Sequence, residues 1–249
     1  MPQHVDKDLL RQQFQRAAVS YEKQAVVQQQ AAERLLELLI QQPQRVLEIG
    51  CGSGLLTRRL LAKFNSIEEL VLNDLVPDFA SRLGLVSPAL RFLPGDIETL
   101  PLPGSFDLII SSSALHWLHD LNSLLDKLAA HLAPGGWLAF SLYGPENLHE
   151  IRELTGIGLK YRSHAELEEA LRRRFRLLHS SRQIETLHFS SPQEVLRHLR
   201  ETGVNSLSRS PWSRAKLEQF CAEYRRRFSA DGGVTLTYDS LYFLAQNAD

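Results

Sequence analysis

The stretch RVLEIGCGSGLLTRRLLAKF, residues 45–64, decides the fold. Its apolar opening, RVLEI, is typical of a parallel strand that is buried on both faces. Gly50, Gly52 and Gly54 follow at alternate positions, where they allow a sharp turn and let a ligand approach the main chain. Leucines recur at helical spacing from Leu55, so a helix begins there and presents its free N–H groups to the loop. The stretch therefore predicts a strand, a ligand-binding loop and a helix.

The glycine spacing and one acid separate two kinds of cofactor. A dinucleotide loop reads G-x-G-x-x-G, whereas the third glycine here comes one residue earlier, at Gly54. Glu48 lies two residues before the first glycine, and its carboxylate would repel a pyrophosphate but attract a cation. S-adenosylmethionine (SAM) carries an α-amino group and a sulfonium, so the loop favours SAM over a dinucleotide. An ordinary turn is the weaker alternative, because it does not require three alternating glycines.

The next two predicted strands also end at acids. Residues 69–74 close with Asp74, which is placed to accept hydrogen bonds from two ribose hydroxyls, or else to cap the following helix. After a strand at 90–94 come Asp96 and Ile97. We expect this acid to accept the adenine amino group and this apolar side chain to cover the ring, with a capped turn as the alternative.

A fourth strand at 105–113 and a fifth at 137–143 complete the core. Ligands of open α/β sheets lie beyond the carboxyl ends of the strands, so the residues after strand four should border the pocket for methyl transfer. His116 and His119 form an H-x-x-H pair, but no third ligand with suitable spacing follows, and we expect no metal. The residues expected at the pocket are Ser111, Ser112, His116 and Trp117.

Together these motifs resemble the class I SAM-dependent methyltransferases over residues 45–143. Within that class the chain is most similar to the malonyl-carrier-protein O-methyltransferases of biotin synthesis. The resemblance implies an α/β Rossmann-like fold, with a mixed seven-stranded sheet, helices on both faces, an N-terminal helical lid and a helical insertion before the last strand. The segments that carry it outside the core are FQRAAVSYEKQAVVQ (14–28), LHEIREL (148–154), LRHLRETGVNSLS (196–208) and LTYDSLYFLA (236–245).

The resemblance also implies an activity. The enzyme would methylate the free carboxylate of malonyl-acyl carrier protein, giving the methyl ester that primes pimeloyl synthesis for biotin. Another small carboxylate or a quinone precursor as acceptor, an NAD-dependent oxidoreductase, and a non-catalytic SAM-binding subunit are the alternatives. The stretch GLKYRSH, residues 158–164, departs from the family, which more often carries a His-Val-Asn type sequence there. The cofactor-binding residues expected are Glu48, Gly50, Cys51, Gly52, Gly54, Asp74, Leu75, Asp96, Ile97 and Ser112.

Segments outside the core should choose the substrate. Residues 1–42 are expected to form a lid, 43–143 the SAM-binding core and 144–249 the substrate side of one domain. Apolar residues at helical spacing between Phe14 and Ala25 predict a lid helix with Tyr21 facing substrate, or simple packing on the sheet edge. Helices are predicted from Pro192 to Glu201 and from Ser213 or Arg214 to Phe228. Beside Tyr21, His116 and Trp117 should position the acceptor, and its carboxylate should meet Arg197, Arg200 or Arg209.

Composition agrees with one intracellular enzyme domain of 249 residues. No signal peptide or long apolar run is evident, and two cysteines suit a reduced chain, so we expect a cytoplasmic protein without membrane contact. The net charge of −1 combines −5 in residues 1–150 with +4 in residues 151–249. Arginine clusters at 172–176 and 225–227 are solvated helix faces or attract an acidic carrier protein. The balanced charge argues against nucleic acid as a partner.

Overall fold

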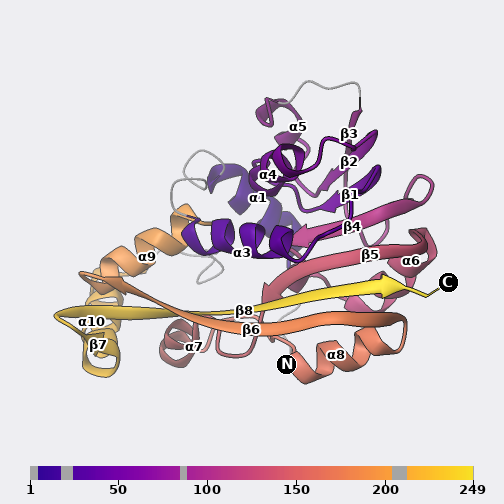
Figure 1. Cartoon of the computed structure of the whole chain (residues 1–249). Helices are drawn as coiled ribbons and strands as arrows, with labels where there is room; N and C mark the ends of the chain where they lie inside the picture. The colour runs from indigo at the N-terminus through magenta and orange to yellow at the C-terminus, as the bar shows by residue number, and fades with distance from the viewer. Residues whose placement is uncertain (1–4, 18–24, 85–88, 204–211, 249) are drawn as a thin grey trace.

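The computed structural model describes residues 5–17, 25–84, 89–203 and 212–248, and in them a mixed sheet forms the centre of the molecule (Figure 1). Its order is β3-β2-β1-β4-β5-β8-β6, and the first five of these strands run parallel. β8 pairs antiparallel with both β5 and β6. The predicted mixed sheet of seven strands is confirmed, and the two-residue β7 pairs with β8 as an eighth. The strands are β1 (Arg45–Ile49), β2 (Glu69–Asp74), β3 (Leu90–Pro94), β4 (Phe106–Ser112), β5 (Leu132–Tyr143), β6 (Phe175–Phe189), β7 (Ser229–Ala230) and β8 (Gly233–Asn247).

Helices cover both faces of this sheet. α3 and α4 contribute to the core on one face, and α6 and α8 to the core on the other. In the described part of the chain no helix is both long and apolar enough to cross a membrane. The helices are α1 (Lys7–Ala17), α3 (Val26–Glu37), α4 (Leu55–Lys63), α5 (Phe79–Arg82), η1 (Leu115–Trp117), α6 (Leu121–His131), α7 (His149–Thr155), α8 (His164–Arg172), α9 (Pro192–Glu201) and α10 (Arg214–Phe228).

The apolar run of β1 has a direct structural cause. Successive side chains of a strand point to opposite faces, and both faces are covered here. Val46 therefore packs with α3 and α4, while Leu47 packs with α6 and α8, and both are fully buried. Burying each such side chain contributes about 1.5–3 kcal/mol. This core fixes the carboxyl end of β1, from which the glycine loop begins.

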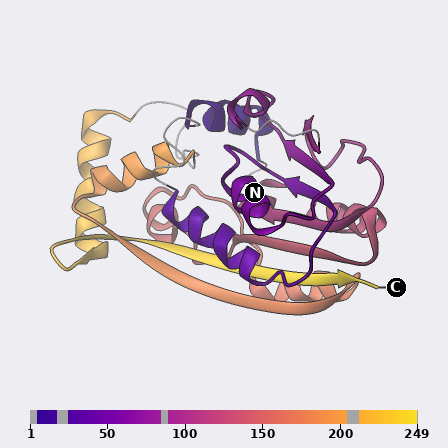
Figure 2. The same cartoon turned by 45° about the horizontal axis from the view of Figure 1, so that its top comes forward.

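The predicted insertion before the last strand is confirmed as α9 and α10. They pack with α7 on the far half of the long β6–β8 pair, away from the core of the sheet (Figures 1 and 2). Local signals in the sequence set the starts of both helices. The Ser191 side chain accepts a hydrogen bond from the N–H of Glu194, and the Ser213 side chain accepts one from the N–H of Lys216.

Two local boundaries differ from the predictions. The fifth strand begins at Leu132 rather than at Trp137, because Leu132 pairs with Phe106 across a bulge in the ladder. The expected apolar helical face from Phe14 to Ala25 is not one described helix: α1 ends at Ala17 and α3 begins at Val26. Tyr21 lies outside the described residues.

Candidate active site

The glycine loop between β1 and α4 forms one wall of a cavity at the carboxyl ends of the parallel strands. Gly50 and Gly52 have φ values of +73° and +52°, a region that side chains disfavour. A Cβ atom on Gly50 would lie 2.5 Å from Cβ of Ala114, so this glycine also permits close packing. Around Gly52 no atom lies within 4 Å of such a Cβ, because its face is open to the cavity. Gly54 does not line the cavity but is the N-cap of α4.

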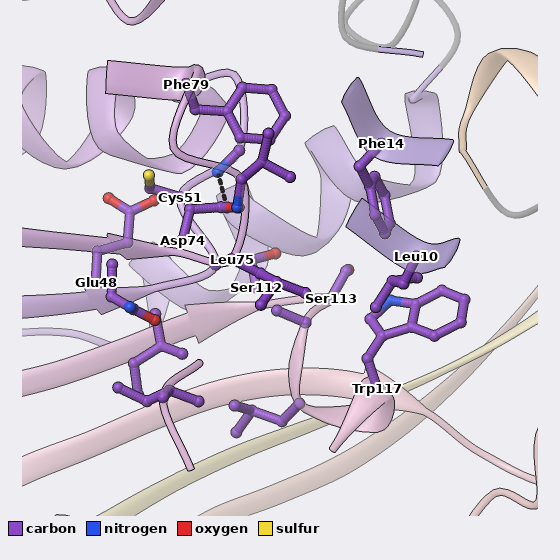
Figure 3. A pocket seen from close by; sticks show the side chains of 18 of the residues that line it. Leu10, Phe14, Glu48, Cys51, Asp74, Leu75, Phe79, Ser112, Ser113 and Trp117 are labelled. Atoms are coloured by element: carbon purple, nitrogen blue, oxygen red, sulfur yellow. Dashed lines mark hydrogen bonds between the residues drawn. The ribbon is translucent and has the colours of Figure 1, made fainter. Parts of the chain in front are cut away.

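The cavity encloses about 1150 Å³, part of it open to solvent. Figure 3 shows acids from the ends of β1 and β2 on one side and aromatic residues of η1 and α1 on the other. A mostly apolar lining with a few polar groups that converge on it is typical of small-molecule and cofactor sites. Of the predicted cofactor-binding residues, those that line it are Glu48, Gly50, Cys51, Gly52, Asp74, Leu75, Asp96, Ile97 and Ser112.

Asp74 ties the end of β2 to the glycine loop. Its Oδ2 accepts a hydrogen bond from the N–H of Gly52 at 2.8 Å, and its Oδ1 accepts one from the N–H of Val76 at 2.8 Å. Neither Asp74 nor Asp78, the N-cap residue of α5, caps that helix with its side chain, so the alternative reading as a cap is wrong. Burial raises the pKa of Asp74 to about 6, against the effect of the two N–H groups. Each carboxylate oxygen keeps a lone pair for a ligand hydroxyl.

Glu48 is a buried acid with an unused acceptor. Its side chain on β1 is 1% exposed, and Oε2 has no hydrogen-bond partner among the described residues. Burial raises the pKa of this carboxyl to about 8, against the opposing effect of the Thr57 side chain and N–H and of the Arg58 charge. Oε1 of Gln28, on α3, also lines the cavity without a partner in the described structure. Two unpaired acceptors in one cavity suit a ligand with a cationic hydrogen-bond donor. The sequence analysis gave Gln28 no role, since only the fold brings α3 to the loop.

Asp96 and Ile97 lie on the cavity wall after β3, as predicted. The capped turn considered as an alternative is present as well, because Oδ1 of Asp96 accepts the N–H of Glu98 at 3.1 Å. Lys7 of α1 lies 2.5 Å from Asp96 Oδ2 and also pairs with Glu98. Partial burial would raise the pKa of Asp96, but the hydrogen bonds from Lys7 and from the N–H of Glu98, together with the charge of Lys7, outweigh it and the pKa is lowered. Sequence reasoning missed Lys7, because its partners lie 89 and 91 residues away.

Helix α1 supplies the apolar side of the cavity. Leu10 and Phe14 line it, and the Phe14 ring meets Trp117 edge-on with centroids 5.9 Å apart (Figure 3). Trp117 is 8% exposed. The N-terminal segment therefore covers the cavity and does more than pack on the sheet edge.

Three residues predicted at the ends of the strands have different environments. Ser112 lines the cavity. Ser111 does not: it is fully buried, and its Oγ donates to the carbonyl of Ile49 at 2.9 Å, so its assignment to the pocket is wrong. This hydroxyl joins β4 to β1. His116 lines a second cavity instead, on the other side of η1.

The predicted substrate arginines are not brought to the cavity. Arg197 and Arg200 are exposed on α9 and line neither cavity, and Arg197 pairs with Glu194 of its own helix at 2.8 Å. Arg209 and Tyr21 lie outside the described residues. Most members of the two arginine clusters are also paired with acids, among them Arg172 with Glu168, Arg174 with Asp126, and Arg226 with Glu223.

A parallel sheet with this strand order, an antiparallel β8 and a glycine loop over a cofactor-sized cavity define a class I methyltransferase. The methyltransferase domain family matches residues 47–140. A solved S-adenosylmethionine dependent methyltransferase of Mesorhizobium loti superposes with a TM-score of 0.56 at 19% identity, over 87% of this chain and 98% of its own. That likeness concerns the fold.

Proteins with similar sequences identify the family within this class of methyltransferases. The malonyl-[acyl-carrier protein] O-methyltransferase of Chlorobium phaeovibrioides is 43% identical over 95% of this chain and 95% of its own length. The protein of the same name from Bacteroides fragilis is 40% identical over 98% of this chain, which spans about half (51%) of that longer relative. The chain belongs to the malonyl-[acyl-carrier protein] O-methyltransferase family.

Proposed function

We propose that this enzyme transfers the methyl group of SAM to the free carboxylate of a malonyl group carried as a thioester on acyl carrier protein. Malonyl methyl ester is then the product. The observation that carries the donor half of this proposal is the buried, unpartnered Oε2 of Glu48 beside the open face of Gly52. The names of the relatives at about 40% identity support the acceptor half.

The residues of the cavity fit SAM in three parts. Glu48 and Gln28 would accept hydrogen bonds from the α-amino group, because both have a free acceptor atom. Asp74 would accept the ribose hydroxyls with its remaining lone pairs. Asp96 and Ile97 would contact adenine, with α1 as a lid over the nucleoside. SAM, when bound, supplies an electrophilic methyl group on a positively charged sulfur.

The acceptor needs no catalytic base. A malonyl carboxyl has a pKa of about 4 by comparison with Asp and Glu, so at neutral pH it is ionised and can attack the methyl carbon directly. The enzyme's contribution is to hold oxygen, carbon and sulfur in line, which supplies about 7–11 kcal/mol in well-oriented reactions. Helix α1 and the Phe14–Trp117 pair cover the donor cavity and would exclude water that otherwise solvates the nucleophile.

Mass spectrometry of carrier proteins tests this function. Purified enzyme and SAM are incubated in parallel with malonyl-acyl carrier protein, malonyl-CoA, free malonate and acetyl-acyl carrier protein. We expect malonyl-acyl carrier protein to gain the mass of one methylene fastest, and the acetyl form, which lacks the carboxylate, to gain none. Methylation of the acetyl form, or of free malonate in preference to the thioesters, would refute the proposed acceptor.

A further inference from the structure

A second cavity lies beside the donor cavity at the carboxyl ends of β4 and β5. It encloses about 1320 Å³, part of it open to solvent. Leu115 and Leu118 line both cavities, so η1 and the residue after it form the partition between them. His116 and Tyr143 form part of its wall, with their rings 4.9 Å apart. Nothing in the predicted donor site uses this space.

One tyrosine of this cavity is held by a chain of buried groups. Nδ2 of Asn147 donates to the Tyr161 hydroxyl at 2.9 Å. A second hydrogen bond fixes the orientation of the Asn147 amide, because its Oδ1 accepts the backbone N–H of Asp239 at 3.4 Å. Asp239 is fully buried, and its carboxylate accepts the Arg182 guanidinium at 2.8 and 3.0 Å and the N–H of Glu146 at 2.9 Å. Tyr161 is thereby fixed relative to β8.

This chain leaves Tyr161 with a proton to donate. An amide nitrogen can only donate, so the hydroxyl accepts from Asn147 and its own O–H has no recorded acceptor among the described residues. Next to it, Nδ1 of His116 is buried without a hydrogen-bond partner in the described structure. Burial lowers the pKa of this imidazole to about 3, so it is neutral at physiological pH. The wall therefore offers uncharged hydrogen-bonding groups, which can orient an acyl group without protonating it.

The rim of the second cavity is positively charged. Lys160 is exposed and Arg162 half-buried, and neither forms an ion pair within 4.0 Å with a carboxylate in the part of the chain described. Nη1 of Arg162 lies 3.5 Å from Oδ1 of Asn122, and the charge of Arg162 helps to lower the pKa of Asp120. The charges of Arg162 and Lys160 both help to lower the pKa of Glu166. Glu166 accepts hydrogen bonds from Ser163 in a capping box. Of these two cations Lys160 is the more exposed, so it is the one more accessible to an incoming anion.

From this arrangement we propose that the second cavity binds the acyl end of an anionic thioester acceptor, with the Tyr161 hydroxyl donating a hydrogen bond to it and Lys160 attracting the negatively charged arm that carries it. The proposal rests on the proposed function. Residues 158–164, in the loop before α8 and at its start, contain both groups. Asn147 and Asp239 act as positioning residues, because they reach the acceptor only through Tyr161.

Tyr161→Phe tests the interior of the cavity. The variant removes one hydroxyl and keeps the ring, so we expect KM for malonyl-acyl carrier protein to rise about tenfold while the Kd of SAM stays unchanged. Tyr224→Phe is the matched control, since it also removes a buried hydroxyl, one that donates to the carbonyl of Thr235 at 2.6 Å in the helical insertion. It should lower thermal stability and leave KM unchanged. An unchanged KM in a folded Tyr161→Phe enzyme overturns the assignment of Tyr161.

Lys160→Glu tests the rim, with Lys216→Glu on the exposed face of α10 as the control. We expect KM to rise about fivefold for malonyl-acyl carrier protein and malonyl-CoA but not for malonyl-pantetheine, which has no phosphate. A rise for the carrier protein alone would assign the anion to the protein surface of the carrier instead of its phosphate. If Lys160→Glu has the same KM as the wild type for each of the three acceptors, the proposed role of Lys160 is overturned. If the wild-type enzyme methylates none of them, the proposed function fails, independently of these variants.

Discussion

The donor cavity and the second cavity lie on two sides of η1 and offer different charged groups to a ligand. The lining of the donor cavity holds the acids Glu48, Asp74 and Asp96 and the cations Lys7 and Arg11, and Lys7 pairs with Asp96. The lining of the second cavity holds Lys160, Arg162 and Glu166. The unpartnered Oε2 of Glu48 in the first cavity suits a cationic hydrogen-bond donor, and exposed Lys160 at the rim of the second can attract an anion. A positively charged methyl donor and a carboxylate acceptor are thereby drawn to opposite sides of one partition.

The two cavities also differ in how they are assembled along the chain. Each acid of the donor cavity lies at or just after the carboxyl end of a parallel strand, so short motifs place it. The second cavity needs His116 after β4, Tyr143 at the end of β5 and Tyr161 in the loop before α8. Variants on one side should therefore change the Kd of SAM, and variants on the other the KM of the acceptor. Each variant below should affect the donor side alone.

Gly52→Val should have the largest effect. The backbone there has φ of +52°, which a β-branched residue strongly disfavours, and the new side chain would fill the open face of the cavity. We expect SAM binding to weaken by more than about a hundredfold in isothermal titration, since strain and lost contact act together.

Gly232→Val provides the matched control for that variant. Gly232 also has a positive φ, +79°, and open space at Cβ, but it lies in the turn between β7 and β8. It should lose stability and keep its affinity for SAM. Equal loss of affinity in both variants would mean that strain alone causes the effect, and the loop would not contact the donor.

Asp74→Asn should cause the second largest loss of SAM affinity. The amide can no longer accept through both atoms, so one of the hydrogen bonds with Gly52 and Val76, or the contact with ribose, is lost. We expect the Kd of SAM to rise about 10- to 100-fold, as for other charge-assisted hydrogen bonds, with the acceptor KM unchanged at saturating SAM. Asp126→Asn, an exposed acid paired with Arg174, is the control. A larger change in acceptor KM than in SAM affinity would break the division between the two cavities.

The parts of the fold and of the candidate site that could be predicted are those that depend on residues close together in the sequence. The strands, the glycine loop and the acids after them follow from local patterns, because periodicity and strand order place each one. Ser111 was misassigned because alternation along β4 turns its hydroxyl toward β1, while Ser112 faces the cavity. Lys7 and Gln28 carry no local signal for a ligand and reach the cavity only through tertiary packing. The arginines of α9 were chosen for their chemistry, but the helix presents them to solvent.

Glu48 gives the smallest effect and the most specific one, because its charge depends on pH. Burial raises its pKa to about 8 in the free enzyme, so at pH 6 the carboxyl is almost entirely protonated. The ammonium group of a ligand binds the ionised carboxylate of Glu48 more tightly than the protonated carboxyl. Binding must therefore release the Glu48 proton. The affinity for SAM should therefore rise about tenfold from pH 6 to pH 7, below the pKa of about 7.7–8.0 of an ordinary α-amino group. Titration in buffers of different ionisation enthalpy measures the proton released.

Glu48→Gln removes this titration and keeps the shape of the side chain. Its SAM affinity should be lower than that of the wild type at pH 7.5 and nearly independent of pH. The free protein supplies a second readout. A carboxyl whose pKa is raised on folding holds its proton more tightly in the folded state, so its contribution to stability is lost as pH rises from about 4.5 to about 8. The Tm of the ligand-free wild type should accordingly fall more over this interval than that of Glu48→Gln. An identical pH dependence of SAM binding in the two proteins would show that Glu48 does not meet a cation.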